Sequence, residues 1–186
     1  LVYVGFVNLV YCLWVIAFGD FIPWTNPYGN ILGTFGNPNF IGAFLGIFAS
    51  VLVAYLLTPG TKLVVRLAGL LILIATFLEI KASLAVQGVV VSGGGIALVI
   101  FYYLRSKFTK WTIPFIYLGS VGVVGFVALM GALQKGPLTS IVYKTSVSLR
   151  GEYWQAGINM GNSHPFTGVG MDSYGDWYRR SRTIEA

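Results

Sequence analysis

The stretch GTFGNPNFIGAFLGIFASVLVAYLL, residues 33–57, joins a polar entry to an apolar run that is long enough for a membrane helix. A helix needs about 20 apolar residues to cross a bilayer. Asn37 followed by Pro38 predicts where this helix begins, because Asn caps helices and Pro fits the first helical position. A plain cap and a site for an anionic ligand are both compatible with this pattern, since exposed helix N-termini bind anions.

The composition of the whole chain also predicts a membrane protein. Of the 186 residues, 56% are hydrophobic and only 10% are charged, whereas soluble proteins carry about 25% charged residues. We therefore expect an all-α polytopic membrane helix bundle. The net charge of +6 does not indicate nucleic-acid binding, because the basic residues are scattered along the chain and form no stripe. The single cysteine allows no intramolecular disulfide.

Apolar runs separated by polar loops predict about five spans, at residues 1–18, 38–57, 64–80, 85–104 and 113–133. The loops 58–66 and 105–112 contain Lys and Arg, whereas the loop 19–37 contains neither. Positive charge in short loops marks the cytoplasmic side. We therefore expect residues 19–37, 79–84 and 134–186 to lie on the outer side of the membrane.

The segment 134–186 carries many aromatic residues, which favours a folded external loop with a helix near 148–162. The chain begins at Leu1 inside an apolar run, has its first methionine at Met130 and stops at Ala186 in a polar stretch. We expect a piece of a longer protein, with helices missing at both ends.

Polar side chains cluster at the outer edge of the predicted spans. Glu79 and Lys81 end the third span, and Gln87 begins the fourth. Glu79 and Lys81 could form an interfacial ion pair with snorkelling side chains. Alternatively, Lys81 and Gln87 could contact phosphate or sugar hydroxyls at the mouth of a cleft. Arg150 suits bidentate phosphate recognition, although it could also lie at the surface or pair with Glu152.

Other features limit the chemistry. His164 is the only histidine and precedes a proline in a turn, which favours a packing or hydrogen-bonding role over catalysis. The chain has no P-loop and no metal-ligand spacing, so we expect a reaction without a metal or other cofactor. The small residues SGGG at 92–95 would let a neighbouring helix approach the fourth span closely.

Two motifs resemble the O-antigen ligase and O-antigen polymerase family of bacterial membrane proteins. GTFGNPNFIGAFL, residues 33–45, is similar to the family's TFGNPN-type entry into a membrane helix. LRGEYWQAGINMGNSHPFTGVGMDSYG, residues 149–175, is similar to its later pattern of an Arg and aromatic helix followed by HP-x-x-G-V-G. The motifs have the family's order, with about 110 residues and several spans between them.

The resemblance implies a GT-C-like enzyme at the periplasmic face of the bacterial inner membrane. It would transfer a glycan from a polyprenyl diphosphate carrier to a hydroxyl of an acceptor glycan or lipid. Arg150 matches the family's arginine and would bind the diphosphate, while Asn37 and Asn39 would line the glycan cleft. Gln87 stands where many members have an arginine, and Lys81 would supply the charge. The family's catalytic His would lie beyond Ala186, in a larger periplasmic loop of which 134–186 is the start, so the piece alone would be inactive.

Three hypotheses about the function remain open from the sequence. A glycan polymerase or ligase would keep its polar groups at the outer edge of the membrane, as this chain does. A polysaccharide flippase or export subunit would bury charged residues within the spans. A non-catalytic membrane scaffold would need neither arrangement. Nothing in the residues separates a polymerase from a ligase.

Overall fold

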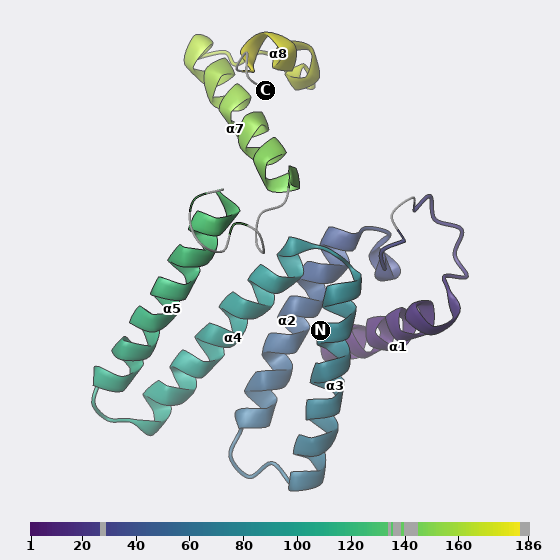
Figure 1. Cartoon of the computed structure of the whole chain (residues 1–186), viewed down its shortest axis with the longest axis vertical. Coiled ribbons are helices and arrows are strands. Elements are labelled where there is room, and N and C mark those ends of the chain that lie inside the picture. The colour runs from purple at the N-terminus through teal and green to yellow at the C-terminus, as the bar shows by residue number, and fades with distance from the viewer. Residues whose placement is uncertain (27–28, 134, 136–138, 140–144, 183–186) are drawn as a thin grey trace. The chain divides into compact units, whose positions relative to one another are not determined.

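All regular structure in the described part of the chain is helical (Figure 1). The computed structural model describes residues 1–26, 29–133, 135, 139 and 145–182. Within these ranges the chain forms α-helices and one 3₁₀ turn, with no strand. The chain divides into two compact units, Leu1–Leu118 and Gly119–Ala186.

Four of the helices are long and apolar enough to cross a membrane: α2 (Pro38–Leu57), α3 (Leu63–Ala82), α4 (Val86–Lys107) and α5 (Thr112–Ala132). They coincide with four of the predicted spans to within a few residues. The prediction of an all-α fold is thereby confirmed for the described residues, and the four helices indicate a membrane protein by their length and composition. In the first unit α2, α3 and α4 alternate in direction, so the α2–α3 and α4–α5 connections lie at the same end (Figure 1).

The ends of α2 follow from local sequence. Asn37 is the N-cap and Pro38 occupies the first turn, as predicted. The helix stops at Thr58, whose backbone is extended (φ −64°, ψ 129°), because a residue before proline is disfavoured in the helical region. Gly60, at φ +82°, then turns the chain toward α3.

Small residues let α2 and α4 pack at close range. A Cβ placed on Gly46 would lie 2.9 Å from both the Gly88 carbonyl oxygen and the Ser92 backbone nitrogen. Contact between helix backbones is typical of small-residue interfaces in membranes. The prediction of close approach is confirmed for Ser92 and Gly95, since a Cβ on Gly95 would lie 2.9 Å from the Ser50 Cβ of α2. Gly93 and Gly94 face open space, because they lie on other sides of α4.

The helix α1 (Val2–Phe18) covers the residues of the predicted first span. It has 17 residues, at the lower end of the length that crosses a bilayer, so its role as a span stays a prediction. It crosses α2 and α3 (Figure 1). A Cβ on Gly5 would meet the ring of Phe48, midway along α2. Tyr11 packs in the same cluster as Ile41, in the first turn of α2. Because of this steep crossing, α1 extends along only part of α2.

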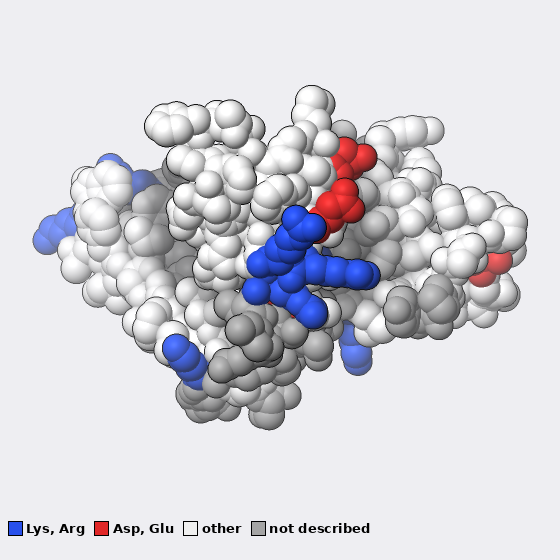
Figure 2. Space-filling view, turned by 90° about the horizontal axis from the view of Figure 1, so that it is seen from above, with Lys and Arg blue, Asp and Glu red and all other residues white. Residues whose placement is uncertain are grey.

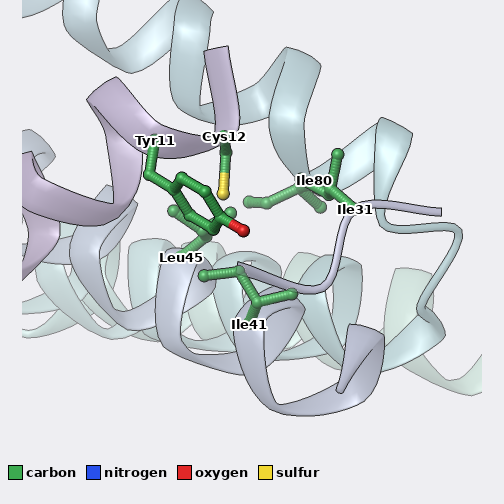
Figure 3. Close-up of a cluster of buried hydrophobic side chains, with 6 residues drawn as sticks. All are labelled: Tyr11, Cys12, Ile31, Ile41, Leu45 and Ile80. Carbon is green, nitrogen blue, oxygen red and sulfur yellow. The ribbon is translucent and has the colours of Figure 1, made fainter. Parts of the chain in front are cut away.

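Six side chains form the buried core where α1, α2, α3 and the connection before α2 meet (Figure 3): Tyr11, Cys12, Ile31, Ile41, Leu45 and Ile80. They come from segments that are far apart in the sequence. This core holds these segments together at the end of the first unit where α2 begins and α3 ends.

The second unit contains α7 (Thr145–Ser163) and α8 (Tyr174–Ser181). The position of α7 confirms the helix predicted near 148–162. Ala156 and Met160 of α7 are buried. The Asn159 side chain donates a 2.8 Å hydrogen bond to the Ser181 carbonyl, which joins α7 to the end of α8.

Candidate functional site at the amino end of α2

The candidate site lies at the end of the first unit that is opposite the basic α2–α3 and α4–α5 connections (Figure 1). Here the connection before α2 packs onto the turn between α3 and α4. The Ile31 amide donates to the Ala82 carbonyl at 3.4 Å, and the Asn30 side chain donates to the Ser83 carbonyl at 3.3 Å. These contacts bring two segments that were predicted to face outward to the same place.

A buried asparagine on α1 anchors the turn that precedes α2. The Oδ1 atom of Asn8 accepts hydrogen bonds from the Thr34 amide at 3.0 Å and the Thr34 hydroxyl at 2.9 Å. Its Nδ2 atom donates to the Val4 carbonyl at 3.1 Å. Asn8 is completely buried and was missed by the sequence reasoning. A lone amide inside an apolar run was the available signal.

Two glycines explain the unusual sequence of the same turn. Gly33 begins the 3₁₀ turn η1 (Gly33–Phe35) at φ +58°, and a Cβ there would lie 2.5 Å from Ile41. Gly36 follows at φ +64°, and a Cβ would lie 2.9 Å from the Trp24 ring. Both positions favour glycine, because L-residues rarely adopt positive φ. The glycines of the GTFGNPN motif therefore have structural roles.

Asn37 caps α2 as predicted. Its Oδ1 atom accepts a 2.8 Å hydrogen bond from the Asn39 amide, one of the amide groups that a helix start leaves without a helical partner. Asn37 and Asn39 are half-buried. The remaining amides of this first turn and the positive end of the helix dipole favour an anion here.

The other two predicted residues of this end lie on either side of the turn between α3 and α4. Lys81 is exposed, and Gln87 is half-buried in the first turn of α4. A Cβ on Gly42, one turn into α2, would lie 3.1 Å from the Ser83 hydroxyl. The structure thus places Asn37, Asn39, Lys81 and Gln87 at one end of the same unit.

The interpretation of Glu79 and Lys81 as an interfacial ion pair is wrong for this structure. Glu79 is completely buried, and neither carboxyl oxygen has a hydrogen-bond partner among the described residues. Lys81 is exposed. The reason is geometric, because side chains two residues apart point to different sides of a helix. Glu79 and Cys12 of α1 are both completely buried in the first unit.

Arg150 belongs to the second unit, so its proximity to the other four predicted residues stays a prediction. It lies near the start of α7 and is exposed. Arg150, Trp154 and Ile158 follow each other at one-turn spacing along α7. All three are exposed. The predicted Arg150–Glu152 pair is not tested.

His164 packs within the second unit, in agreement with the structural role predicted for it. Its ring meets the Trp177 ring edge-on at 4.8 Å, and its Nδ1 atom lies 3.0 Å from the Ser163 hydroxyl. Its carbonyl accepts from the Gly168 amide at 3.0 Å. These contacts join the HP turn to both helices.

Charged side chains also gather on the face seen from above (Figure 2), where basic groups lie beside acidic ones. The short helix α8 contributes both signs, with Asp176 in its first turn and Arg179 and Arg180 in its last. Arg180 lies over the Trp177 ring at 5.8 Å. Within the described ranges, no three His, Cys, Asp or Glu side chains come together as a metal site would require.

Comparisons with protein-family models, with curated proteins and with solved structures give no match to this chain. The resemblance to the O-antigen ligase and polymerase family therefore rests on the two sequence motifs alone. What the structure adds is the arrangement of these motifs within each unit.

Proposed function

We propose that this chain is part of a membrane glycosyltransferase that moves a glycan from a polyprenyl diphosphate carrier to an acceptor hydroxyl on the periplasmic face of the bacterial inner membrane. It would be a polymerase or ligase of the O-antigen type and would need no metal. The observation that carries this proposal is the Asn-capped amino end of α2. It lies at the same end of the first unit as Lys81 and Gln87, opposite the basic connections.

This end of the bundle has the chemistry that a lipid-linked diphosphate requires. The first amides of α2 and the helix dipole favour negative charge. Lys81 adds a cation, and the side-chain amides of Asn39 and Gln87 can bond sugar hydroxyls or phosphate oxygens. Because the diphosphate is the leaving group, stabilising its charge accelerates the transfer. Arg150 would provide a second, bidentate contact.

The distribution of basic residues supports an outward-facing site. Lys62 and Arg66 flank the start of α3, and Arg105 and Lys107 lie in the last turn of α4. These residues lie at the end expected to face the cytoplasm. The candidate site then faces the periplasm, where a carrier glycan and its acceptor would meet.

No residue of this chain is assigned as the catalytic base. His164 has a packing role and is not assigned to catalysis. The acceptor hydroxyl would need such a group to remove its proton during transfer.

Glu79 favours one alternative, a polysaccharide flippase or export subunit. A completely buried carboxyl without a hydrogen-bond partner among the described residues is costly within a membrane, and such groups often mark transport paths. However, Glu79 lies in the last turn of α3, near the proposed outer face. We therefore place this alternative second.

The test is glycan transfer by the complete gene product in proteoliposomes with a polyprenyl diphosphate-linked glycan. Arg150→Ala should slow transfer by about 10²-fold or more, the usual effect of removing one group that stabilises developing charge. Arg150→Lys should retain part of the rate, because it keeps the charge but loses the bidentate geometry. Arg179→Ala, an exposed arginine on α8, is the matched control and should leave the rate unchanged.

Normal transfer by Arg150→Ala would contradict the assignment of this arginine. Movement of the lipid-linked glycan across the bilayer without any transfer would instead support the flippase alternative.

A further inference from the structure

The helix α7 leaves one side uncovered within its unit. Ala156 and Met160, which are buried, mark the side of α7 that packs inside the unit. Trp154 and Ile158 lie on the opposite side, with 71% and 56% of their surfaces exposed. Arg150 lies one turn before Trp154 and is also exposed. We call Arg150, Trp154 and Ile158 the outer face of α7.

The composition of this face is that of a helix at a membrane surface. Tryptophan is enriched at the boundary between lipid and water, where the apolar ring and the indole N–H each find a suitable environment. Helices that lie in this boundary present Trp and aliphatic residues to the lipid, and a long basic side chain on the same face can extend its charged end to the headgroups. In water, Trp154 and Ile158 would stay exposed at a cost of about 25 cal/mol for each Å² of apolar surface.

The chain also holds α7 close to a bilayer. The membrane-spanning helix α5 ends at Ala132 and α7 begins at Thr145, so only twelve residues separate the two helices. Twelve residues reach at most about 40 Å when fully extended. A bilayer surface is therefore always within reach of the outer face.

The charge on this face selects the kind of lipid. Arg150 is its only charged residue, and Glu152 projects from another side of α7, near Tyr178 of α8. A basic residue near the surface is attracted to anionic lipids by about 1 kcal/mol. Anionic phospholipid is thus the occupant that matches both the apolar and the basic part of the face.

We propose that α7 docks on the outer surface of the bilayer, with Trp154 and Ile158 at the lipid–water boundary and Arg150 at the level of the phospholipid phosphates. This inference does not depend on the proposed transfer reaction. It gives that reaction a geometric basis, however, because the diphosphate of a lipid carrier lies at the same level as Arg150.

The test uses single cysteines in the full chain, reconstituted in liposomes that contain anionic phospholipid. Trp154→Cys and the matched control Glu152→Cys are labelled with the same fluorophore. Quenching is then measured with lipids that carry a nitroxide near the headgroup. The label at position 154 should be quenched about two-fold or more beyond the label at position 152, because only the outer face contacts lipid. Cys12 is completely buried, and the unsubstituted protein reports its background labelling.

Ile158→Cys is a second probe in case Trp154→Cys fails to fold, and it should behave like position 154. Replacing the anionic lipid by a neutral one should weaken the quenching at both positions. Equal quenching at 152 and 154 would overturn the proposal. So would protection of position 154 from both lipid and aqueous quenchers, which would mean that protein covers the face. The assay needs no glycan, so its failure would leave Arg150-dependent transfer untouched, and the reverse also holds.

Discussion

At the scale of single residues, Asn37 has two roles that substitution can separate. Its side chain caps α2 through the 2.8 Å hydrogen bond from the Asn39 amide, and the proposed function adds a contact with the glycan diphosphate. Asn37→Ala should lower the free energy of unfolding by about 1 kcal/mol, the usual cost of losing a cap. Thermal unfolding in detergent measures this effect.

Asn37→Ser is the informative companion, because serine caps helices about as well as asparagine. We expect it to preserve the unfolding temperature while lowering the rate of glycan transfer, since its hydroxyl is shorter than the amide. If Asn37→Ser retained both full stability and full transfer, the cap would be the only role of this residue.

Glu79 poses a different question at the same scale. Its two carboxyl oxygens are buried without hydrogen-bond partners among the described residues. Leaving a buried polar group unsatisfied costs about 1–3 kcal/mol. Glu79→Leu should therefore raise the free energy of unfolding by about 1 kcal/mol or more, measured as a higher unfolding temperature in detergent.

The isosteric control, Glu79→Gln, should gain less stability than Glu79→Leu, because it keeps a polar group in the same place. A loss of stability in both variants would show that Glu79 has a partner outside the described residues. That result would also strengthen the flippase alternative, in which this carboxyl contacts the transported ligand.

At the scale of helices, the α2–α4 interface offers two glycines with opposite expected behaviour. A Cβ on Gly46 would lie 2.9 Å from backbone atoms of α4, whereas a Cβ on Gly94 would meet no atom within 4 Å. Gly46→Ala should destabilise the bundle by about 1–3 kcal/mol, because the backbones must separate. Gly94→Ala should be neutral or stabilising by up to about 1 kcal/mol, since alanine favours the helix.

Unfolding of the two variants in the same detergent makes the comparison direct, because they share one helix pair and one substitution. If neither substitution lowered the stability, the α2–α4 contact would not be close in the membrane. If both lowered it equally, the Gly94 side of α4 would be covered there.

At the scale of the whole molecule, the helices were predictable and the contacts between them were not. The spans at 38–57, 64–80, 85–104 and 113–133 coincide with helices to within a few residues, because apolar length is a local property of the sequence. The Asn37 cap was predictable for the same reason.

What the sequence did not indicate depends on contacts between distant segments. The Asn8–Thr34 hydrogen bonds, the packing of Ile31 near Ala82 and the burial of Glu79 all arise where α1 crosses the bundle. Nothing in the sequence indicated this crossing. Residue types therefore predicted which polar residues share one end of the first unit, but not how their side chains are held.

The charge of the connections predicts the orientation of the bundle, and this prediction can be tested directly. Lys62 and Lys110 lie in connections at one end of the first unit, and Thr25 lies in the connection before α2 at the other. Thr25→Cys should react with a membrane-impermeant maleimide in intact spheroplasts, because its side is expected to be periplasmic. Lys62→Cys and Lys110→Cys should react only after the membrane is permeabilised. The opposite pattern would place the candidate site in the cytoplasm, where a periplasmic glycan transfer could not occur.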